Sequence, residues 1–308
     1  MMSIDPLAIL ANSRVTTPLV PIQLHEHGVT IWCKLEFLNP SGSTKDRIAR
    51  YILSKAMRSQ LIQPGDQVVE ASSGSTSIAF ALASAQLGLH FTAVMPENVS
   101  PERVKIIRAY GASVELTKAA KGIDASIRLA QQIHEQHNAF WPRQFSNFDN
   151  AKAHCDETAA EVLCQIPSGK VDMFVSGVGT GGTLVGVTQG LASAGCQITP
   201  VLARPVSNRL ISDVECCSFS TRIPGVVDGL STIFRDADLP DLRQFEISDE
   251  EAIDTTRKLI RAGFPVGPSS GLNYLAAVQA YKEHGGDPIC LTVFPDRMER
   301  YFSTDLFS

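Results

Sequence analysis

The chain has 308 residues, of which 44% are hydrophobic and 19% charged, a composition typical of a globular protein of about two domains. Its net charge of −5 provides no basic excess to neutralise a phosphate backbone, which argues against a nucleic-acid-binding protein. No apolar run reaches the ~18 residues that a membrane span needs, and the N-terminus lacks the basic start of a signal peptide.

The cysteines and histidines indicate neither disulfides nor a metal site. Seven cysteines, an odd number, are scattered without a CxxC motif, which favours free thiols in a reducing compartment. The histidine pairs, His25 with His27 and His134 with His137, have no third ligand at a suitable spacing. We therefore expect a soluble cytoplasmic protein without a metal.

Strand-like and helix-like segments alternate along the first half of the chain. Residues 29–38 alternate apolar with polar side chains, as a half-buried strand does, with Lys34 and Glu36 on the polar side. A helix is expected at 45–60. Strands at 67–71, 91–95 and 112–116 are then each followed by a helix, at 77–89, 100–111 and 123–136.

A second series of alternating segments begins near residue 150. Helices are expected at 151–166, 184–195, 247–263 and 271–286, and strands at 171–176, 198–203 and 289–294. The third of these helices begins with a capping box, Ser248 and Glu251. Repeated strand-then-helix units form parallel sheets that helices cover on both faces, so the sequence predicts two α/β domains.

Three loops are unusually rich in small polar residues, "NPSGSTKDR" (39–47), "ASSGSTS" (71–77) and "GVGTGGT" (177–183). Each is expected to follow a strand and to begin a helix. Backbone N–H groups and the positive end of the helix dipole make such a junction a site for an anion. In α/β sheets these junctions gather at the carboxyl ends of the strands, where ligands bind.

The loop "GVGTGG" also fits the dinucleotide fingerprint GxGxxG, with Gly177, Gly179 and Gly182. That fingerprint usually has an acid at the end of the next strand, to bind the ribose. Here the next strand delivers Arg204, which would suit a 2′-phosphate. An NADP-binding protein is therefore an alternative of a different class.

Lys45 stands in the first turn of its expected helix, where the helix dipole disfavours a cation by about 0.3–1 kcal/mol. A free lysine has a pKa of about 10.4, and the positive helix end eases its deprotonation, as an amine nucleophile requires. A Schiff-base lysine beside a phosphate loop and a carboxylate loop describes an enzyme that uses pyridoxal phosphate (PLP) on an amino acid.

Four motifs together resemble the cysteine synthase and cystathionine β-synthase family, the fold type II PLP enzymes. They are "KLEFLNPSGSTKDR", "QFSN" (144–147), "GTGGT" (179–183) and "GPSSG" (267–271), and the likeness extends from residue 17 to 307. It implies a two-domain α/β fold like that of the tryptophan synthase β subunit, with each domain a mostly parallel sheet covered by helices. Residues 40–149 would form a smaller mobile domain, and residues 1–39 and 150–308 a larger domain.

The resemblance also implies the roles of individual residues. Lys45 would be the catalytic Schiff-base residue of the smaller domain. The implied cofactor-binding residues are Lys45, Ser75, Gly179, Thr180, Gly181, Gly182, Thr183 and Ser269. The implied substrate-binding residues are Ser72, Ser73, Gly74, Thr76, Gln144 and Asp228.

The implied reaction is β-replacement on an activated L-serine, in which O-acetyl-L-serine and sulfide give L-cysteine through an aminoacrylate. Lys45, once displaced by the substrate, would act as general base on the α-proton. The alternative within the family is β-elimination or β-replacement on L-cysteine or L-serine, as in a cysteine desulfhydrase or a cystathionine β-synthase. The partners would be a small amino acid and sulfide or a thiol, and the family likeness implies a homodimer.

The chain departs from the family pattern at several positions. The family has asparagine at the ring hydroxyl of PLP, where this chain has Ser75, which is shorter and offers one donor instead of two. Asp228 stands in a substrate segment where enzymes that use serine tend to have an acid. Arg204 replaces a frequent glutamate, and we expect it to pair with a nearby acid, Asp213 or Glu215, the alternative being a distal carboxylate or phosphate of a substrate. Arg297 occupies a position at which small residues are common.

Overall fold

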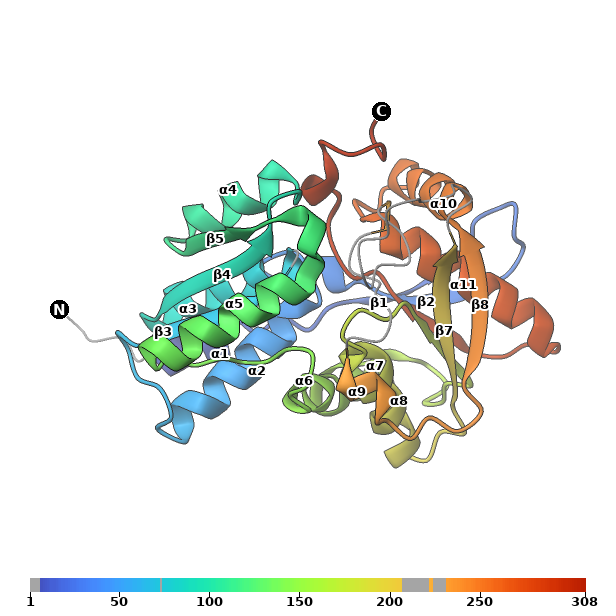
Figure 1. Ribbon diagram of the computed structural model, residues 1–308. Coiled ribbons are helices and arrows are strands. Elements are labelled where there is room, and N and C mark those ends of the chain that lie inside the picture. The colour runs from blue at the N-terminus through green and yellow to red at the C-terminus, as the bar shows by residue number, and fades with distance from the viewer. Residues whose placement is uncertain (1–5, 73, 207–221, 224–230) are drawn as a thin grey trace.

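The computed structural model describes residues 6–72, 74–206, 222–223 and 231–308. It contains two sheets, and helices cover each of them (Figure 1). Two of the predicted substrate residues, Ser73 and Asp228, lie outside the described residues, as do Asp213 and Glu215.

The smaller sheet is parallel and has the order β3-β4-β5, formed by β3 (Gln67–Ala71), β4 (His90–Pro96) and β5 (Ser113–Thr117). On one face pack α1 (Pro6–Asn12), α2 (Lys45–Arg58), α3 (Ser75–Leu87) and α4 (Pro101–Ala109), around one apolar core. The other face is covered by α5 (Gly122–His137) (Figure 1).

The larger sheet has the order β1-β2-β9-β6-β7-β8. Its strands are β1 (Leu19–Ile22), β2 (Ile31–Lys34), β6 (Met173–Ser176), β7 (Thr199–Val206), β8 (Arg243–Ser248) and β9 (Cys290–Val293). Only the β1–β2 pair of this sheet is antiparallel. One face is covered by α10 (Asp249–Arg261) and α11 (Pro268–His284), and the other by α7 (Ala160–Gln165) and α8 (Gly182–Ser193). The predicted α/β architecture with mostly parallel sheets is confirmed.

Short helical segments complete the described chain. They are α6 (Asp149–Ala153), α9 (Thr232–Arg235), a π-helix over His154–Ala159, and 3₁₀ turns at Glu36–Leu38, Ala119–Lys121 and Met298–Tyr301. The π-helix and its two flanking α-helices together replace the single helix predicted at 151–166.

The capping box was predicted correctly, whereas both edge strands of the larger sheet, β1 and β8, were missed. Ser248 accepts from the Glu251 amide, and the Glu251 carboxylate accepts from the Ser248 amide. Strand β8, which lies at an edge of the larger sheet, was not predicted. Its side chains are largely polar and only partly buried, so the apolar signal of a core strand is absent there.

The prediction of a half-buried strand at 29–38 was wrong on its polar side. Strand β2 ends at Lys34, and Lys34 and Glu36 are both 0% exposed. Ionised groups are buried only when they are paired, and both residues have charged partners from α2 and α7. The periodicity identified the two faces of the segment correctly, but the polar face is also buried, against α2 and α7.

No helix within the described part of the chain is long and apolar enough to cross a membrane. Among the same residues there is no group of three or more histidine, cysteine, aspartate or glutamate side chains that could hold a metal ion.

Candidate active site

Lys45 and the glycine-rich loop meet at the carboxyl ends of two neighbouring strands. Helix α2 begins at Lys45. The residues just before it lie against the chain that follows β9, because the Thr44 amide donates to the Pro295 carbonyl at 2.8 Å and Ser43 forms a β-bridge with Asp296. The glycine-rich loop follows β6, which pairs with β9. Loops at adjacent strand ends of a parallel sheet are the usual place for a ligand.

The Lys45 amine is prepared for nucleophilic chemistry. Its side chain is half-buried, and burial lowers its pKa, while the negative charges of Asp296 and Glu36 act in the opposite direction. None of the ion pairs between described residues involves Lys45. A desolvated, unpaired lysine is a nucleophile that a carbonyl compound can capture.

The glycine-rich loop is packed so closely that side chains would not fit. Gly181 has a φ of +80°, and a Cβ there would lie 2.6 Å from the Cβ of Phe234. A Cβ on Gly182, where α8 begins, would lie 1.9 Å from Oδ1 of Asn150. The first amides of α8 have no intrahelical acceptors, so the loop presents N–H groups and a positive dipole end to an anion.

Two side chains that sequence reasoning missed support this loop. Asn150 donates through Nδ2 to Thr180 Oγ1 at 2.9 Å and to the Gln144 carbonyl at 2.9 Å. His154 Nε2 lies 3.2 Å from Thr183 Oγ1. His154 belongs to the π-helix, an element often found at functional sites, but no sequence motif announced it.

His154 is a neutral hydrogen-bonding group. It is 0% exposed, and burial lowers the pKa of the imidazole to about 3. Its Nδ1 lies 2.9 Å from Thr158 Oγ1. If the Thr183 hydroxyl donates to an anion in the loop, its oxygen is left to accept from His154 Nε2–H, and Nδ1 then accepts from Thr158.

The serine-rich loop lies at the carboxyl end of β3 and brings two predicted substrate residues together. Thr76 Oγ1 donates to Gln144 Oε1 at 2.7 Å, and Gln144 Nε2 donates to the Ala71 carbonyl at 2.5 Å. Ser72 Oγ accepts from the Gly74 amide at 3.0 Å. Gln144 therefore keeps one N–H for a ligand, and the chain Thr76–Gln144–Asn150 connects this loop to Thr180 of the glycine-rich loop.

Ser75 and the segment that leads to Ser269 both contact Asp296, which follows β9. Ser75 Oγ donates to Asp296 Oδ2 at 3.0 Å. Ser269 is half-buried in the first turn of α11, and the preceding Gly267 donates its amide to the Asp296 carbonyl oxygen at 2.9 Å. Sequence reasoning did not single out Asp296, although an acid directly after a predicted strand end was a usable signal.

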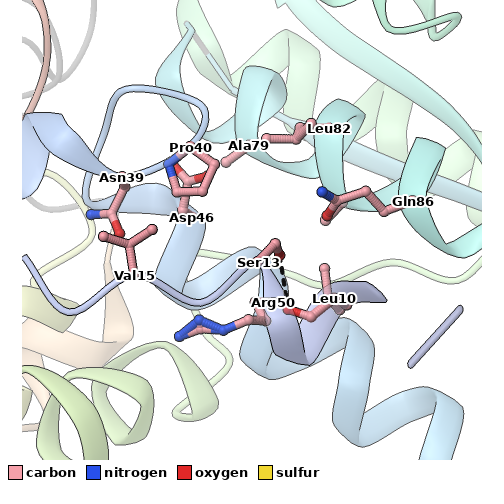
Figure 2. Close-up of a pocket in the computed structure, with 11 residues that line it drawn as sticks. Leu10, Ser13, Val15, Asn39, Pro40, Asp46, Arg50, Ala79, Leu82 and Gln86 are labelled. Carbon is pink, nitrogen blue, oxygen red and sulfur yellow. Dashed lines mark hydrogen bonds between the residues drawn. The ribbon is translucent and has the colours of Figure 1, made fainter. Parts of the chain in front are cut away.

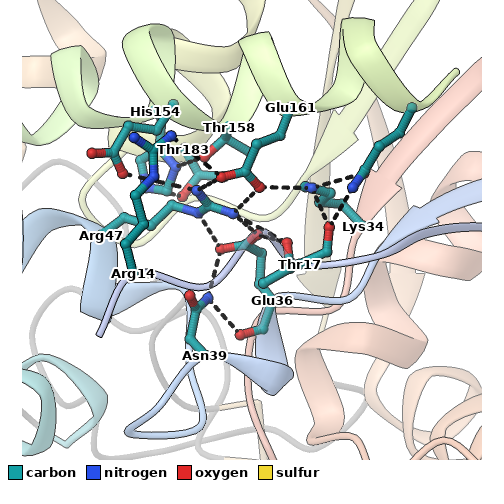
Figure 3. A network of polar contacts seen from close by, with 12 residues as sticks. Arg14, Thr17, Lys34, Glu36, Asn39, Arg47, His154, Thr158, Glu161 and Thr183 are labelled. Atoms are coloured by element: carbon teal, nitrogen blue, oxygen red, sulfur yellow. Dashed lines mark hydrogen bonds and ion pairs between the residues drawn. The ribbon is translucent and has the colours of Figure 1, made fainter. Parts of the chain in front are cut away.

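A buried ion network lies behind Lys45, and we define it as Lys34, Glu36, Arg47 and Glu161 (Figure 3). Arg47 donates to Glu36 at 2.6 and 2.7 Å and to Glu161 at 2.8 and 2.9 Å. Lys34 Nζ lies 2.9 Å from Glu161 Oε2. The network fixes the first turn of α2, and hence Lys45, relative to the larger sheet.

A separate cavity lies beside the lysine segment but is not part of the site. It holds about 320 Å³ of space, part of it open to solvent, between Ser13, Asn39, Asp46, Arg50 and Gln86 (Figure 2). Neither Lys45 nor any residue of the other two loops lines it.

Two of the departures from the family pattern take structural partners. Arg204 Nη1 lies 3.2 Å from Glu246 Oε1, its register partner on β8, while the two acids expected to pair with it, Asp213 and Glu215, lie outside the described residues. Arg297 packs over Gly42, where a Cβ would lie 3.0 Å from its Cδ.

The comparisons with known proteins agree on one family. The family model described as "Pyridoxal-phosphate dependent enzyme" matches residues 11–296. Cysteine synthase B of Campylobacter jejuni is 39% identical over 293 residues, which cover 95% of this chain and 96% of that protein.

Solved structures of similar proteins share the fold. The chain matches a hydrogen sulfide-producing enzyme from Fusobacterium nucleatum with a TM-score of 0.88 and 32% identity, over 98% of this chain and 92% of that one. An aspartate-to-asparagine variant of that enzyme is described in complex with an α-aminoacrylate intermediate. The O-acetylserine-dependent cystathionine β-synthase from Helicobacter pylori matches with a TM-score of 0.87 and 29% identity, over 100% of each chain.

Proposed function

The chain belongs to the family of pyridoxal-phosphate dependent enzymes, and we propose that it joins an activated L-serine to sulfide, as a cysteine synthase does. The observation that carries this proposal is the place of Lys45, a half-buried amine with a lowered pKa at the same sheet edge as the glycine-rich loop. This family membership favours PLP over the dinucleotide alternative for "GVGTGG".

The residues at this edge fit PLP. Lys45 would hold the cofactor covalently, Gly179 to Thr183 would bind its phosphate through the amides at the start of α8, and Ser269 would meet the ring nitrogen. The tight packing at Gly181 and Gly182 supports a backbone cradle, because a Cβ at either position would clash. When bound, PLP withdraws electrons from the substrate's α-carbon and so makes the α-proton acidic.

The serine-rich loop would hold the substrate's carboxylate. Thr76 would offer its backbone amide at the start of α3, and Gln144 would offer its remaining N–H, whereas the amide of Gly74 is already donated within the loop. Ser72, whose hydroxyl accepts from the Gly74 amide, would fix the shape of the loop. Roles for Ser73 and Asp228, which lie outside the described residues, stay predictions from sequence.

Lys45 would also move the proton. An amine that substrate has displaced from the cofactor stays tethered at the start of α2, within the same cleft as the α-carbon. Burial lowers its pKa, which favours the neutral amine that can accept the α-proton. Ser269 would be a neutral partner of the ring nitrogen, which suits β-elimination and replacement more than transamination.

A second candidate function is release of sulfide from cysteine. The observation that favours it is the 32% identity to the hydrogen sulfide-producing enzyme of Fusobacterium nucleatum over nearly the whole chain. Asp228, as an acid near the substrate, would help a poor leaving group such as hydrosulfide depart. Use of L-serine belongs to the same alternative.

The decisive experiment is a Lys45→Ala substitution. We expect purified wild-type protein to carry a yellow chromophore, and Lys45→Ala to lose it together with at least about 100-fold of the β-replacement rate. Assays with O-acetylserine, O-phosphoserine, serine and cysteine, each with and without sulfide, separate the two candidate functions. A colourless wild-type protein that binds NADP would contradict both.

The domain boundaries at 40 and 149, the homodimer and the cytoplasmic location remain part of this proposal. In support of the boundaries, the strands of the smaller sheet fall within 67–117, and those of the larger sheet fall within 19–34 and 173–293. One segment departs from the boundary at 40: helix α1 packs on α2 and α3, so residues 6–12 would move with the smaller domain. Closure of that domain over substrate would exclude water from the site.

A further inference from the structure

Asp296 is bonded on one side only. Its Oδ2 accepts from Ser75 Oγ at 3.0 Å and from the Tyr301 hydroxyl at 2.7 Å. Its Oδ1 has no hydrogen-bond partner and is buried, as is the residue as a whole, which is only 6% exposed. A buried carboxylate oxygen without a donor is costly, which marks it as a place where a donor arrives.

The backbone holds this carboxylate beside Lys45. Ser43 forms a β-bridge with Asp296, and the Thr44 amide donates to the Pro295 carbonyl at 2.8 Å. Gly267 leaves room for the free oxygen, because a Cβ there would lie 2.4 Å from Asp296 Oδ1. The free oxygen, the start of α2 and the start of α11 therefore share one corner of the site.

Two negative charges act on Lys45, those of Asp296 and Glu36, and only the charge of Asp296 is uncompensated. Although burial would raise it, the Arg47 guanidinium holds the pKa of Glu36 at about 2, so the charge of Glu36 is balanced within the buried ion network. Burial keeps His154 neutral, with a pKa of about 3. Asp296 makes no ion pair among the described residues.

The cations nearest this corner face other groups. The Arg103 guanidinium lies over the Tyr301 ring, 5.2 Å from its centroid. Arg300 donates to the Ser41 carbonyl at 2.5 Å. Arg297, the residue after Asp296, packs over Gly42. Asp296 forms no ion pair with these arginines in the described part of the chain, whereas its charge acts on Lys45.

We propose that Asp296 is a positioning residue whose free oxygen keeps a proton on the Lys45 nitrogen, with Ser75 and Tyr301 fixing the orientation of the carboxylate. This inference rests on the proposed function, in which Lys45 carries PLP. A proton on this nitrogen makes the adjoining cofactor carbon more electrophilic toward the substrate's amino group. Ser75 would act through Asp296, since its one O–H is already donated there.

The test is a pH titration of the absorption band of the PLP-loaded protein, which changes when the Lys45 nitrogen loses its proton. An opposite charge close to a titrating group moves its pKa by about 1–3 units. We expect Asp296→Asn to lose the band of the protonated form at a pH at least about one unit below the wild type. Asp296→Glu, which keeps the charge, should recover part of the difference.

Asp287→Asn is the matched control, since it removes one carboxylate charge from an exposed site beyond the C-terminal end of α11. It should titrate like the wild type, and Ser75→Ala and Tyr301→Phe, which keep the Asp296 charge, should shift the midpoint less than Asp296→Asn. The proposal is overturned if Asp296→Asn keeps the protonated band to the same pH as the wild type. If the wild-type protein has no absorption band that is lost in Lys45→Ala, the proposed function itself is contradicted.

Discussion

Two polar clusters flank the start of α2, and they differ in how completely their atoms are bonded. In the buried ion network, Arg47 and Lys34 together pair with the carboxylates of Glu36 and Glu161 (Figure 3). The Thr17 hydroxyl also donates to Glu36, at 2.7 Å. In the other cluster, Lys45 has no ion pair among the described residues and Asp296 Oδ1 has no donor. Asp296 is as buried as Glu161 of the network, each 6% exposed, so exposure does not explain why one carboxylate is satisfied and the other is not.

The difference separates a structural cluster from one that awaits a ligand. A buried network in which every group is satisfied rigidifies what it connects, and here it connects α2 with β2 and α7. Orphan polar atoms are retained where another molecule completes them. Arg47 is two residues from Lys45, so the satisfied cluster holds the unsatisfied one in place. Stability should therefore depend on the first, and spectra and chemistry on the second.

The largest expected effect on stability is that of Arg47→Leu. This substitution leaves Glu36 and Glu161 buried with fewer partners, and breaking a buried pair costs about 3–5 kcal/mol of unfolding free energy. Urea unfolding measures the change. Arg243→Leu is the matched control, because its pair with Glu283 is exposed and should contribute less than about 1 kcal/mol. Equal losses in the two variants would refute the structural role of the network.

The next effect is a change in the acid sensitivity that His154 confers. Burial depresses the pKa of His154 from 6.5 to about 3, so the unfolded chain binds the proton first. The neutral His154 therefore costs no unfolding free energy above pH 6.5. As the pH falls from 6.5 toward 3, the unfolding free energy decreases by about 1.4 kcal/mol per pH unit.

Unfolding free energy measured at pH 7 and pH 5 therefore tests His154. The wild type should lose about 2 kcal/mol more over this interval than His154→Asn does. The exposed His137→Asn should follow the wild type. If His154→Asn and the wild type lose the same unfolding free energy between these pH values, the pKa of the His154 imidazole is not lowered in the folded protein.

The smallest effect on stability is expected from Asp296→Asn. The asparagine oxygen can still accept from Ser75 and Tyr301, and the substitution removes a buried charge whose second oxygen has no donor. We expect the unfolding free energy of the cofactor-free protein to change by less than about 1 kcal/mol. A loss as large as that of Arg47→Leu would place Asp296 among the structural charges and remove the contrast between the two clusters.

Much of the candidate site could be predicted because its chemistry lies in local motifs. The glycine-rich loop, the serine-rich loop and the lysine at a helix start are contiguous in sequence, and each motif leads into the expected helix. The capping box at Ser248 is equally local. Short-range patterns of this kind carry their own geometry, since hydrogen bonds within a few residues define them.

The missed residues act across the fold. Asn150 bridges Gln144 and Thr180, His154 contacts Thr183, and Asp296 meets Ser75 across 221 positions of the chain. Asparagine, histidine and aspartate are common on surfaces, so their types alone do not reveal burial. Their partners come from distant elements, and pairing at that range leaves no periodic signal.

The sequence by itself determined an alternation of strands and helices, and with it an α/β fold whose polar loops collect at strand ends, because side-chain periodicity and glycine placement act locally. It also predicted that Lys45 carries the reactive amine. Only the tertiary structure decided which charges are buried and which are satisfied, because burial and pairing depend on elements that meet in space. Lys34 and Glu36 look like the solvent side of a strand in sequence, yet they lie in the interior beside Arg47, while Asp296 keeps an oxygen free next to Lys45.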